Sequence, residues 1–153
     1  MNLVFAFILL ATLYMVNAIP PQQLLKKTST TFVSCPVFEG APPPTLTVTL
    51  SPDPIVAGTA DVFTVSGILN YDITASDELV ISFSDPLANT VINTTAVALC
   101  DGSNCPIKAG IPFTQTVQVS VPAKLPSPYA AIVAVVDPVA NGMIGCAVAF
   151  VWL

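Results

Sequence analysis

The sequence contains no histidine and no arginine, and only 8% of its 153 residues are charged. Without histidine, the chain cannot form a Ser-His-Asp triad, a Cys-His dyad or an HExxH zinc site. Its four lysines cannot neutralise the roughly six to ten phosphates that a DNA-binding protein contacts. We therefore expect no enzyme activity, no cofactor and no nucleic-acid partner for this acidic chain, whose formal net charge is −5.

Residues 1–18 have the composition of a secretory signal peptide. The apolar run 3–16 is shorter than the roughly 20 residues of a membrane-spanning helix. Val16 and Ala18 place small side chains at the −3 and −1 positions of a cleavage site. An uncleaved membrane anchor is the alternative. We expect cleavage after Ala18 and a protein that is secreted or that reaches a vacuolar or lysosomal lumen.

Residues 19–34 are polar and proline-rich and show no periodicity, which predicts a flexible leader. Lys26 and Lys27 form a dibasic pair, so residues 19–27 are either a pro-segment removed by a processing protease or an ordinary solvated tail. The folded domain is predicted to cover residues 35–153.

The four cysteines favour disulfide bonds over a metal site, because no histidine is present and the cysteine spacings do not repeat. Four cysteines allow three pairings. Cys100 and Cys105 enclose a four-residue turn sequence that is suited to a small clip. Cys35 and Cys146 would then join the start of the domain to its last strand.

Apolar and polar residues alternate with a period of two over 45–50, 63–69, 79–84 and 116–121, which is typical of half-buried strands. Further candidate strands are 90–99, 129–136 and 143–152, of which the last two are apolar on both faces. Prolines separate these runs, and no stretch shows a helical period. Seven or eight short strands predict an all-β fold, an immunoglobulin-like antiparallel β-sandwich.

Few polar residues stand out from this pattern. Asn93, with Thr94 and Thr95, forms the only N-glycosylation sequon, which predicts a surface position. The acidic residues fall mostly at predicted turns, and we assign them no catalytic role. Asp77 and Glu78 are adjacent and would point to opposite faces of a strand, so we expect solvated side chains rather than paired catalytic carboxylates.

The segment 100–110, CDGSNCPIKAG, resembles the Cys-x4/5-Cys-Pro-aliphatic element of the ML lipid-recognition family. Other elements match in the family's order: Cys35, the segment 54–58, Val121-Pro122, Pro128-Tyr129, Asp137 and the segment 142–146. The resemblance covers residues 35–153. It is closest to the fungal phosphatidylglycerol/phosphatidylinositol transfer proteins, which are relatives of the Niemann–Pick type C sterol carrier.

The resemblance implies a sandwich whose two sheets hold one lipid between them, with disulfides Cys35–Cys146 and Cys100–Cys105. It implies a monomeric carrier that contacts membranes transiently and transfers a phospholipid (phosphatidylglycerol or phosphatidylinositol) or a sterol between them. Two alternatives remain open at this point. One is a secreted lipid-sensing or recognition module without transfer activity, and the other is an adhesion-type sandwich whose apolar faces simply pack together.

We expect a lipid cavity lined by the apolar residues of the inward-facing sets: Phe63, Val65, Leu69, Leu79, Ile81, Phe83, Val117, Val119, Val133, Val148 and Phe150. The loop 105–113 is the expected cavity mouth, because it is kinked by prolines and carries Ile107, Ile111 and Phe113 beside Lys108. Lys108 is expected to approach anionic head groups. The alternative is that Ile107 and Phe113 close the end of the core and Lys108 is merely solvated.

Overall fold

A computed structural model describes residues 29–36, 41–140 and 142–152. The predicted signal peptide 1–18 and the dibasic pair Lys26-Lys27 lie outside these residues. The described residues form seven strands: β1 (Thr47–Ser51), β2 (Ala60–Ile68), β3 (Glu78–Asp85), β4 (Thr90–Ala98), β5 (Pro112–Ser120), β6 (Tyr129–Asp137) and β7 (Gly142–Val151). Within these three ranges, no helix is long and apolar enough to span a membrane.

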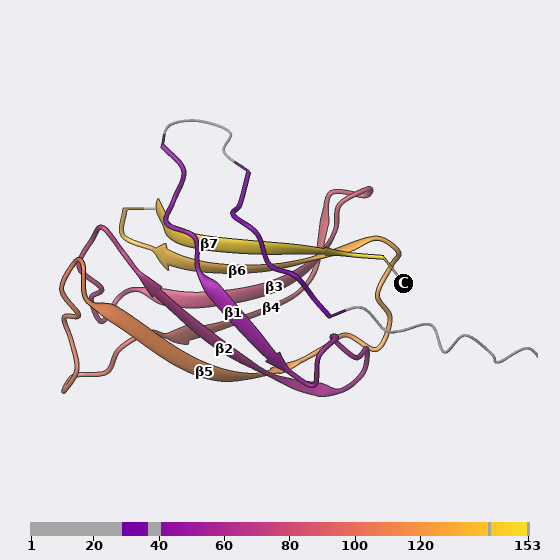
Figure 1. Cartoon of the computed structure of the whole chain (residues 1–153), viewed down its shortest axis with the longest axis horizontal. Helices are drawn as coiled ribbons and strands as arrows, with labels where there is room; N and C mark the ends of the chain where they lie inside the picture. The colour runs from indigo at the N-terminus through magenta and orange to yellow at the C-terminus, as the bar shows by residue number, and fades with distance from the viewer. Residues whose placement is uncertain (1–28, 37–40, 141, 153) are drawn as a thin grey trace, which may run out of the picture.

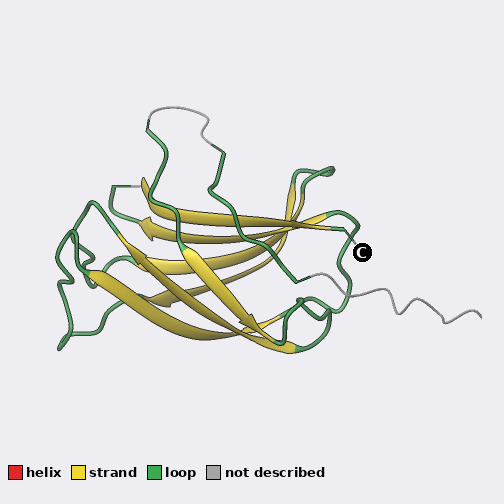
Figure 2. Ribbon diagram, in the orientation of Figure 1, coloured by secondary structure: helices red, strands yellow, loops and turns green. Residues whose placement is uncertain are grey.

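The strands form two antiparallel sheets that pack face to face (Figures 1 and 2). One sheet has the order β1-β2-β5 and the other has the order β4-β3-β6-β7. The predicted immunoglobulin-like β-sandwich is therefore confirmed. In the seven-stranded antibody constant type the fourth strand lies in the same sheet as the first two, whereas here β4 pairs with β3. The consecutive strands β4 and β5 are consequently edge strands of different sheets.

The core lies between the sheets and follows the period of two in the sequence. Phe63 on β2 and Phe83 on β3 meet edge to face, with ring centroids 6.4 Å apart, and this contact joins the two sheets. The ring of Tyr129 on β6 lies 6.3 Å from that of Phe83. Each of these fully buried aromatic side chains contributes about 2–3 kcal/mol through removal of apolar area from water.

The ordered domain begins before Cys35. Val33 exchanges two backbone hydrogen bonds with Val148 on β7, at 2.8 and 2.9 Å, and the Cys35–Cys146 disulfide follows directly. The amide of Thr30 donates to Asp53 at 2.8 Å. Residues 29–34 therefore pack on the sandwich, which differs from the flexible leader that their polar composition predicts.

The sequence predicts that Val148 and Phe150 face inward, and this prediction is wrong. Ala147 lies opposite Val133 in the β6–β7 register, and both belong to the core between the sheets. Because neighbouring strand residues point to opposite faces, Val148 and Phe150 lie on the outer face together with Cys146. The N-terminal segment pairs with β7 at Val148, whereas Phe150 is 53% exposed.

Two carboxylates are buried, and for one of them, Asp77, the sequence predicts a solvated side chain. Asp61 on β2 is fully buried and accepts hydrogen bonds from the Thr59 hydroxyl (2.6 Å) and the Val56 amide (3.1 Å). Asp77 is 2% exposed and accepts from the Thr74 amide at 2.6 Å. Both side chains accept hydrogen bonds from backbone donors of neighbouring turns, but Asp77 Oδ1 has no hydrogen-bond partner within the described residues.

Candidate functional site

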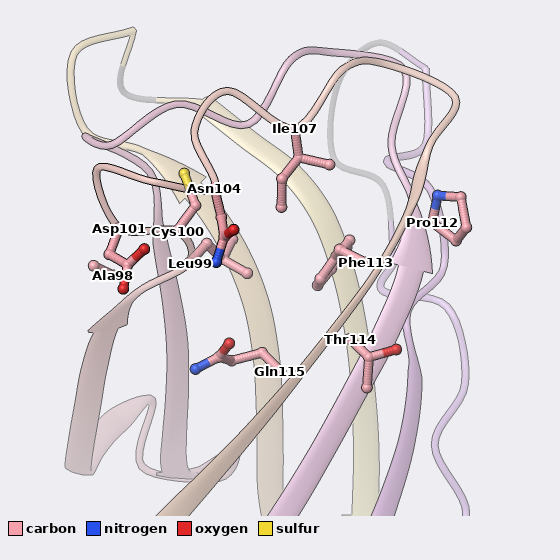
Figure 3. Close-up of a pocket in the computed structure, with 10 residues that line it drawn as sticks. All are labelled: Ala98, Leu99, Cys100, Asp101, Asn104, Ile107, Pro112, Phe113, Thr114 and Gln115. Atoms are coloured by element: carbon pink, nitrogen blue, oxygen red, sulfur yellow. The ribbon is translucent and has the colours of Figure 1, made fainter.

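A pocket of about 400 Å³ opens between the end of β4 and the start of β5, on the edge where the two sheets do not pair (Figure 3). Its lining comes from the end of β4, the connecting loop and the start of β5: Ala98, Leu99, Cys100, Asp101, Asn104, Ile107, Pro112, Phe113, Thr114 and Gln115. Leu99 and Phe113 also belong to the hydrophobic core, so this pocket lies at the boundary between the core and solvent.

The loop that frames this pocket is held at several points. The Cys100–Cys105 disulfide closes its first turn, as the resemblance implies. Ile107 then exchanges two backbone hydrogen bonds with Ile73, at 2.8 and 2.9 Å. The amide of Gly110, whose φ of +79° favours glycine, donates to the Leu69 carbonyl at 2.9 Å. The loop 99–111, which contributes to the pocket lining, is therefore fastened to the neighbouring loop 69–77.

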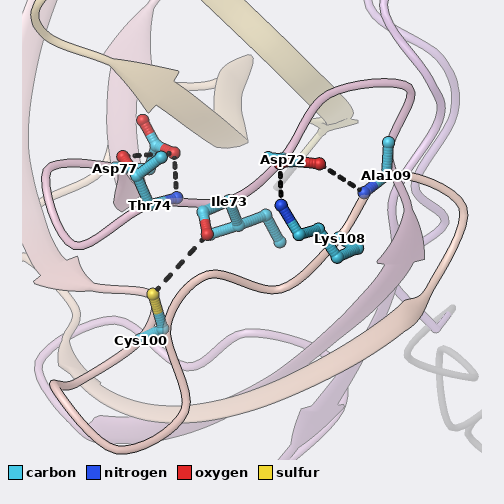
Figure 4. Close-up of polar contacts among 7 residues, drawn as sticks. All are labelled: Asp72, Ile73, Thr74, Asp77, Cys100, Lys108 and Ala109. Carbon is cyan, nitrogen blue, oxygen red and sulfur yellow. Dashed lines mark hydrogen bonds and ion pairs between the residues drawn. The ribbon is translucent and has the colours of Figure 1, made fainter.

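The predicted head-group contact, Lys108, already has a partner in the neighbouring loop (Figure 4). Its ammonium group lies 2.8 Å from Asp72 Oδ2, and Asp72 Oδ1 accepts the amide of Ala109 at 2.9 Å. The hydrogen bond from Lys108 and then that from Ala109 lower the pKa of Asp72. The pair is solvent-exposed, so it contributes little to stability, but it neutralises the cation nearest to the pocket.

The expected mouth residues divide into two groups. Phe113 is only 5% exposed and packs in the core. It lies opposite Gly67 in the β2–β5 register. Ile107 is half-buried against the same core. Ile111, in contrast, is 54% exposed. Phe113 and Ile107 thus form the floor of the pocket, and Ile111 stands outside it.

Sequence reasoning missed the polar residues of the pocket. Gln115 shares the inward parity of Phe113 and Val117, and it is half-buried among the lining residues. Asn104 and Asp101 border the pocket from the loop. The sequence signal for Gln115 was its place in the β5 alternation, where it is the one polar residue on an apolar face. These three side chains, together with the Thr114 hydroxyl, provide the hydrogen-bonding groups of the pocket lining.

The structure packs the remaining predicted lining residues together between the sheets, in the same core cluster as Phe113, and none of them lines the pocket. They are buried members of one core cluster: Phe63, Val65, Leu69, Leu79, Ile81, Phe83, Val117, Val119 and Val133. Asn93 lies at the other end of the same open edge, where its Nδ2 donates to the Ser120 carbonyl at 3.0 Å.

A second cavity, of about 600 Å³, lies on the outer face of the four-stranded sheet. Val148 and Phe150 line it together with residues of the N-terminal segment and of the β3–β4 turn, and no lining side chain is charged. This cavity explains why β6 and β7 are apolar on both faces, because their outer face is partly covered by residues 33–36 and 41–45. Within the described ranges, no three His, Cys, Asp or Glu side chains are close enough to hold a metal ion.

The fold and the pocket define a β-sandwich with one unpaired edge, at one end of which a pocket lies beside the core. The family model of the ML domain matches residues 29–152, so the chain belongs to the ML domain family. This match confirms the resemblance drawn from the cysteine and proline motifs. It supports lipid binding or recognition as the class of function.

Comparison with curated proteins finds no match. Similar solved structures include chicken MD-1 in complex with lipid IVa, which is 11% identical with a TM-score of 0.49, over 79% of this chain and 86% of that chain. Two structures of Bacteroides uniformis β-glucuronidases, one of them a calcium-binding mutant, are 13% identical with a TM-score of 0.42. They cover 71% of this chain and 13% of those chains. The family assignment rests on the ML domain match alone.

Proposed function

We propose that this protein binds one phospholipid or sterol between its two sheets and transfers it between membranes. The observation that carries the proposal is the pocket at the β4–β5 edge, whose lining residues Leu99 and Phe113 belong to the apolar core. Exposing a lipid chain to water costs about 0.8 kcal/mol per CH₂ group. A carrier therefore needs an apolar interior with a lateral opening, and at this edge the pocket lies directly against the apolar core.

The topology supports an opening movement at this edge. Because β4 and β5 belong to different sheets, they can separate without loss of ladder hydrogen bonds. The pocket marks one end of the edge, and the Asn93–Ser120 hydrogen bond links the strands at the other end. A lipid would enter beside Gln115 and displace the sheets at the pocket end, while the Asn93 end stays closed.

The charges at the mouth favour a ligand whose polar end is uncharged. Asp101 is the one charged residue among the pocket-lining residues, and Lys108 is paired with Asp72. An anionic phosphate beside Asp101 would be repelled, whereas a hydroxyl group would find Gln115 and Asn104 as partners. Of the candidate lipids, a sterol fits these groups better than phosphatidylglycerol or phosphatidylinositol.

Lipid extraction followed by mass spectrometry of the purified protein tests binding, and vesicle-to-vesicle transfer tests delivery. Gln115→Trp should fill the pocket and lower the bound lipid per protein. Gln118→Trp is the matched control, because Gln118 lies on the exposed face of the same strand. Equal lipid content in the two variants, or no lipid in the native protein, would count against the proposal.

A recognition module that senses lipid without transferring it is the second candidate. It shares the pocket and differs only in the transfer assay, where it would load lipid but deliver none. The two disulfides are typical of oxidising compartments. We propose the secretory route, with the protein secreted as a monomer or held in a vacuolar or lysosomal lumen.

A further inference from the structure

Three large apolar side chains are exposed beside the pocket. Ile68 is 55% exposed at the end of β2, Tyr71 is 63% exposed in the loop that follows, and Ile111 is 54% exposed in the facing loop. The hydrogen bond from Gly110 to Leu69 lies between them and joins the two loops. We call Ile68, Tyr71 and Ile111 the apolar rim.

Two members of the apolar rim, Ile68 and Ile111, adjoin the pocket lining. Ile68 lies opposite Pro112 in the β2–β5 register, and Pro112 lines the pocket. Ile111 directly precedes Pro112. A surface that receives the apolar rim would therefore also cover the opening through which a lipid passes.

The charges around the apolar rim are predominantly negative. Asp72, Glu78 and Asp101 lie in or next to the two loops, and the one cation of these loops, Lys108, is 2.8 Å from Asp72. The whole chain carries a formal charge of −5. An anionic bilayer would repel this end of the molecule, because no unpaired basic residue of these two loops is available to attract it.

We infer that the apolar rim docks the pocket mouth onto a zwitterionic bilayer surface, which has no net charge. Ile68, Tyr71 and Ile111 insert among the head groups. The inference rests on the proposed lipid-carrier function and names the membrane surface that this function uses. Docking is hydrophobic rather than electrostatic. It therefore persists at high salt and weakens as anionic lipid is added to the bilayer.

Flotation of the full-length secreted protein with phosphatidylcholine vesicles tests this inference. The native protein should float with pure phosphatidylcholine and float less as phosphatidylglycerol replaces it. Tyr71→Ser and Ile111→Ser should each weaken binding about fivefold, the change expected from roughly 40 Å² of lost apolar contact. Leu87→Ser is the matched control, because Leu87 is 80% exposed in the β3–β4 turn at the opposite end of the sandwich.

Several results would overturn the inference. These are unchanged flotation of both rim variants, an equal loss in Leu87→Ser, binding that requires anionic lipid and disappears in salt, or no binding to any vesicle. Extraction of lipid from the same preparations separates this inference from the proposed function. Protein that floats without bound lipid would refute the carrier function and support the docking surface. Protein that carries lipid but never floats would refute the docking surface and leave the carrier function intact.

Discussion

The side-chain amide of Asn93, on β4, donates a hydrogen bond to the backbone carbonyl of Ser120, on β5, across 3.0 Å. These strands are edges of different sheets, so this bond ties the sheets together at the end of the edge remote from the pocket. Asn93 is also the acceptor of the only glycosylation sequon. The same residue is therefore a candidate for modification and for closure of the sandwich.

Replacement of Asn93 by Ala should lower the free energy of unfolding by about 1 kcal/mol through loss of this hydrogen bond. Thr95→Val removes the sequon and leaves Asn93 in place, so it separates the effect of a glycan from that of the bond. Chemical denaturation measures the stability, and intact mass shows whether a glycan is attached. If Asn93→Ala and Thr95→Val were equally destabilised, the hydrogen bond would have no specific role.

The two disulfides should differ in their contribution to stability. Cys35–Cys146 spans 111 residues and joins the N-terminal segment to β7, whereas Cys100–Cys105 spans 5. In the loop-entropy model the long loop corresponds to about 5 kcal/mol and the short one to about 2 kcal/mol. Paired Cys-to-Ala variants compared by urea denaturation test this order. A larger loss from the Cys100–Cys105 pair would contradict it.

Phe113 and Ile111 should respond in opposite ways to an acidic substitution. Phe113→Asp places a charge in the core and should lower the free energy of unfolding by about 4 kcal/mol or more. Ile111→Asp changes an exposed position and should alter stability by less than about 0.5 kcal/mol. Thermal unfolding of the two variants makes the comparison. Similar melting temperatures would mean that Phe113 is not a core residue.

Tyr129 should make stability depend on alkaline pH. Burial, and secondarily the negative charge of Asp61, raises the pKa of Tyr129 from its ordinary value of 10.0 to about 12. Because the unfolded chain ionises more easily, the stability contributed by the neutral phenol is complete below pH of about 10 and is lost as the pH rises toward 12. Absorbance titration should show one tyrosine that ionises late.

Tyr129→Phe is the variant that tests this assignment. The hydroxyl has no hydrogen-bond partner within the described part of the chain, so its removal should leave the stability at neutral pH unchanged or raise it by up to about 1 kcal/mol. The late-titrating group should disappear, and the alkaline loss of stability should become smaller. A destabilised variant at neutral pH would reveal a partner for the hydroxyl.

Local alternation was sufficient to predict most strands, because inward and outward residues differ in polarity wherever one face of a sheet meets water. Phe63 and Val65 on β2 and Val117 and Val119 on β5 are buried as the period of two predicts. The same signal fails for Val148 and Phe150. In β7 both faces are apolar, so alternation carries no information about which face is the inner one.

The sequence by itself determined the strands, the cysteine framework and the family motif, since each depends on short-range pattern or on residue type. Only the tertiary structure decided that Lys108 meets Asp72, that Gln115 lines the pocket and that Ile111, not Phe113, is exposed. These features arise where two loops distant in sequence are fastened together and where β4 joins the opposite sheet from β5. A local sequence period cannot predict these contacts, because they depend on which strands and loops become neighbours in the folded protein.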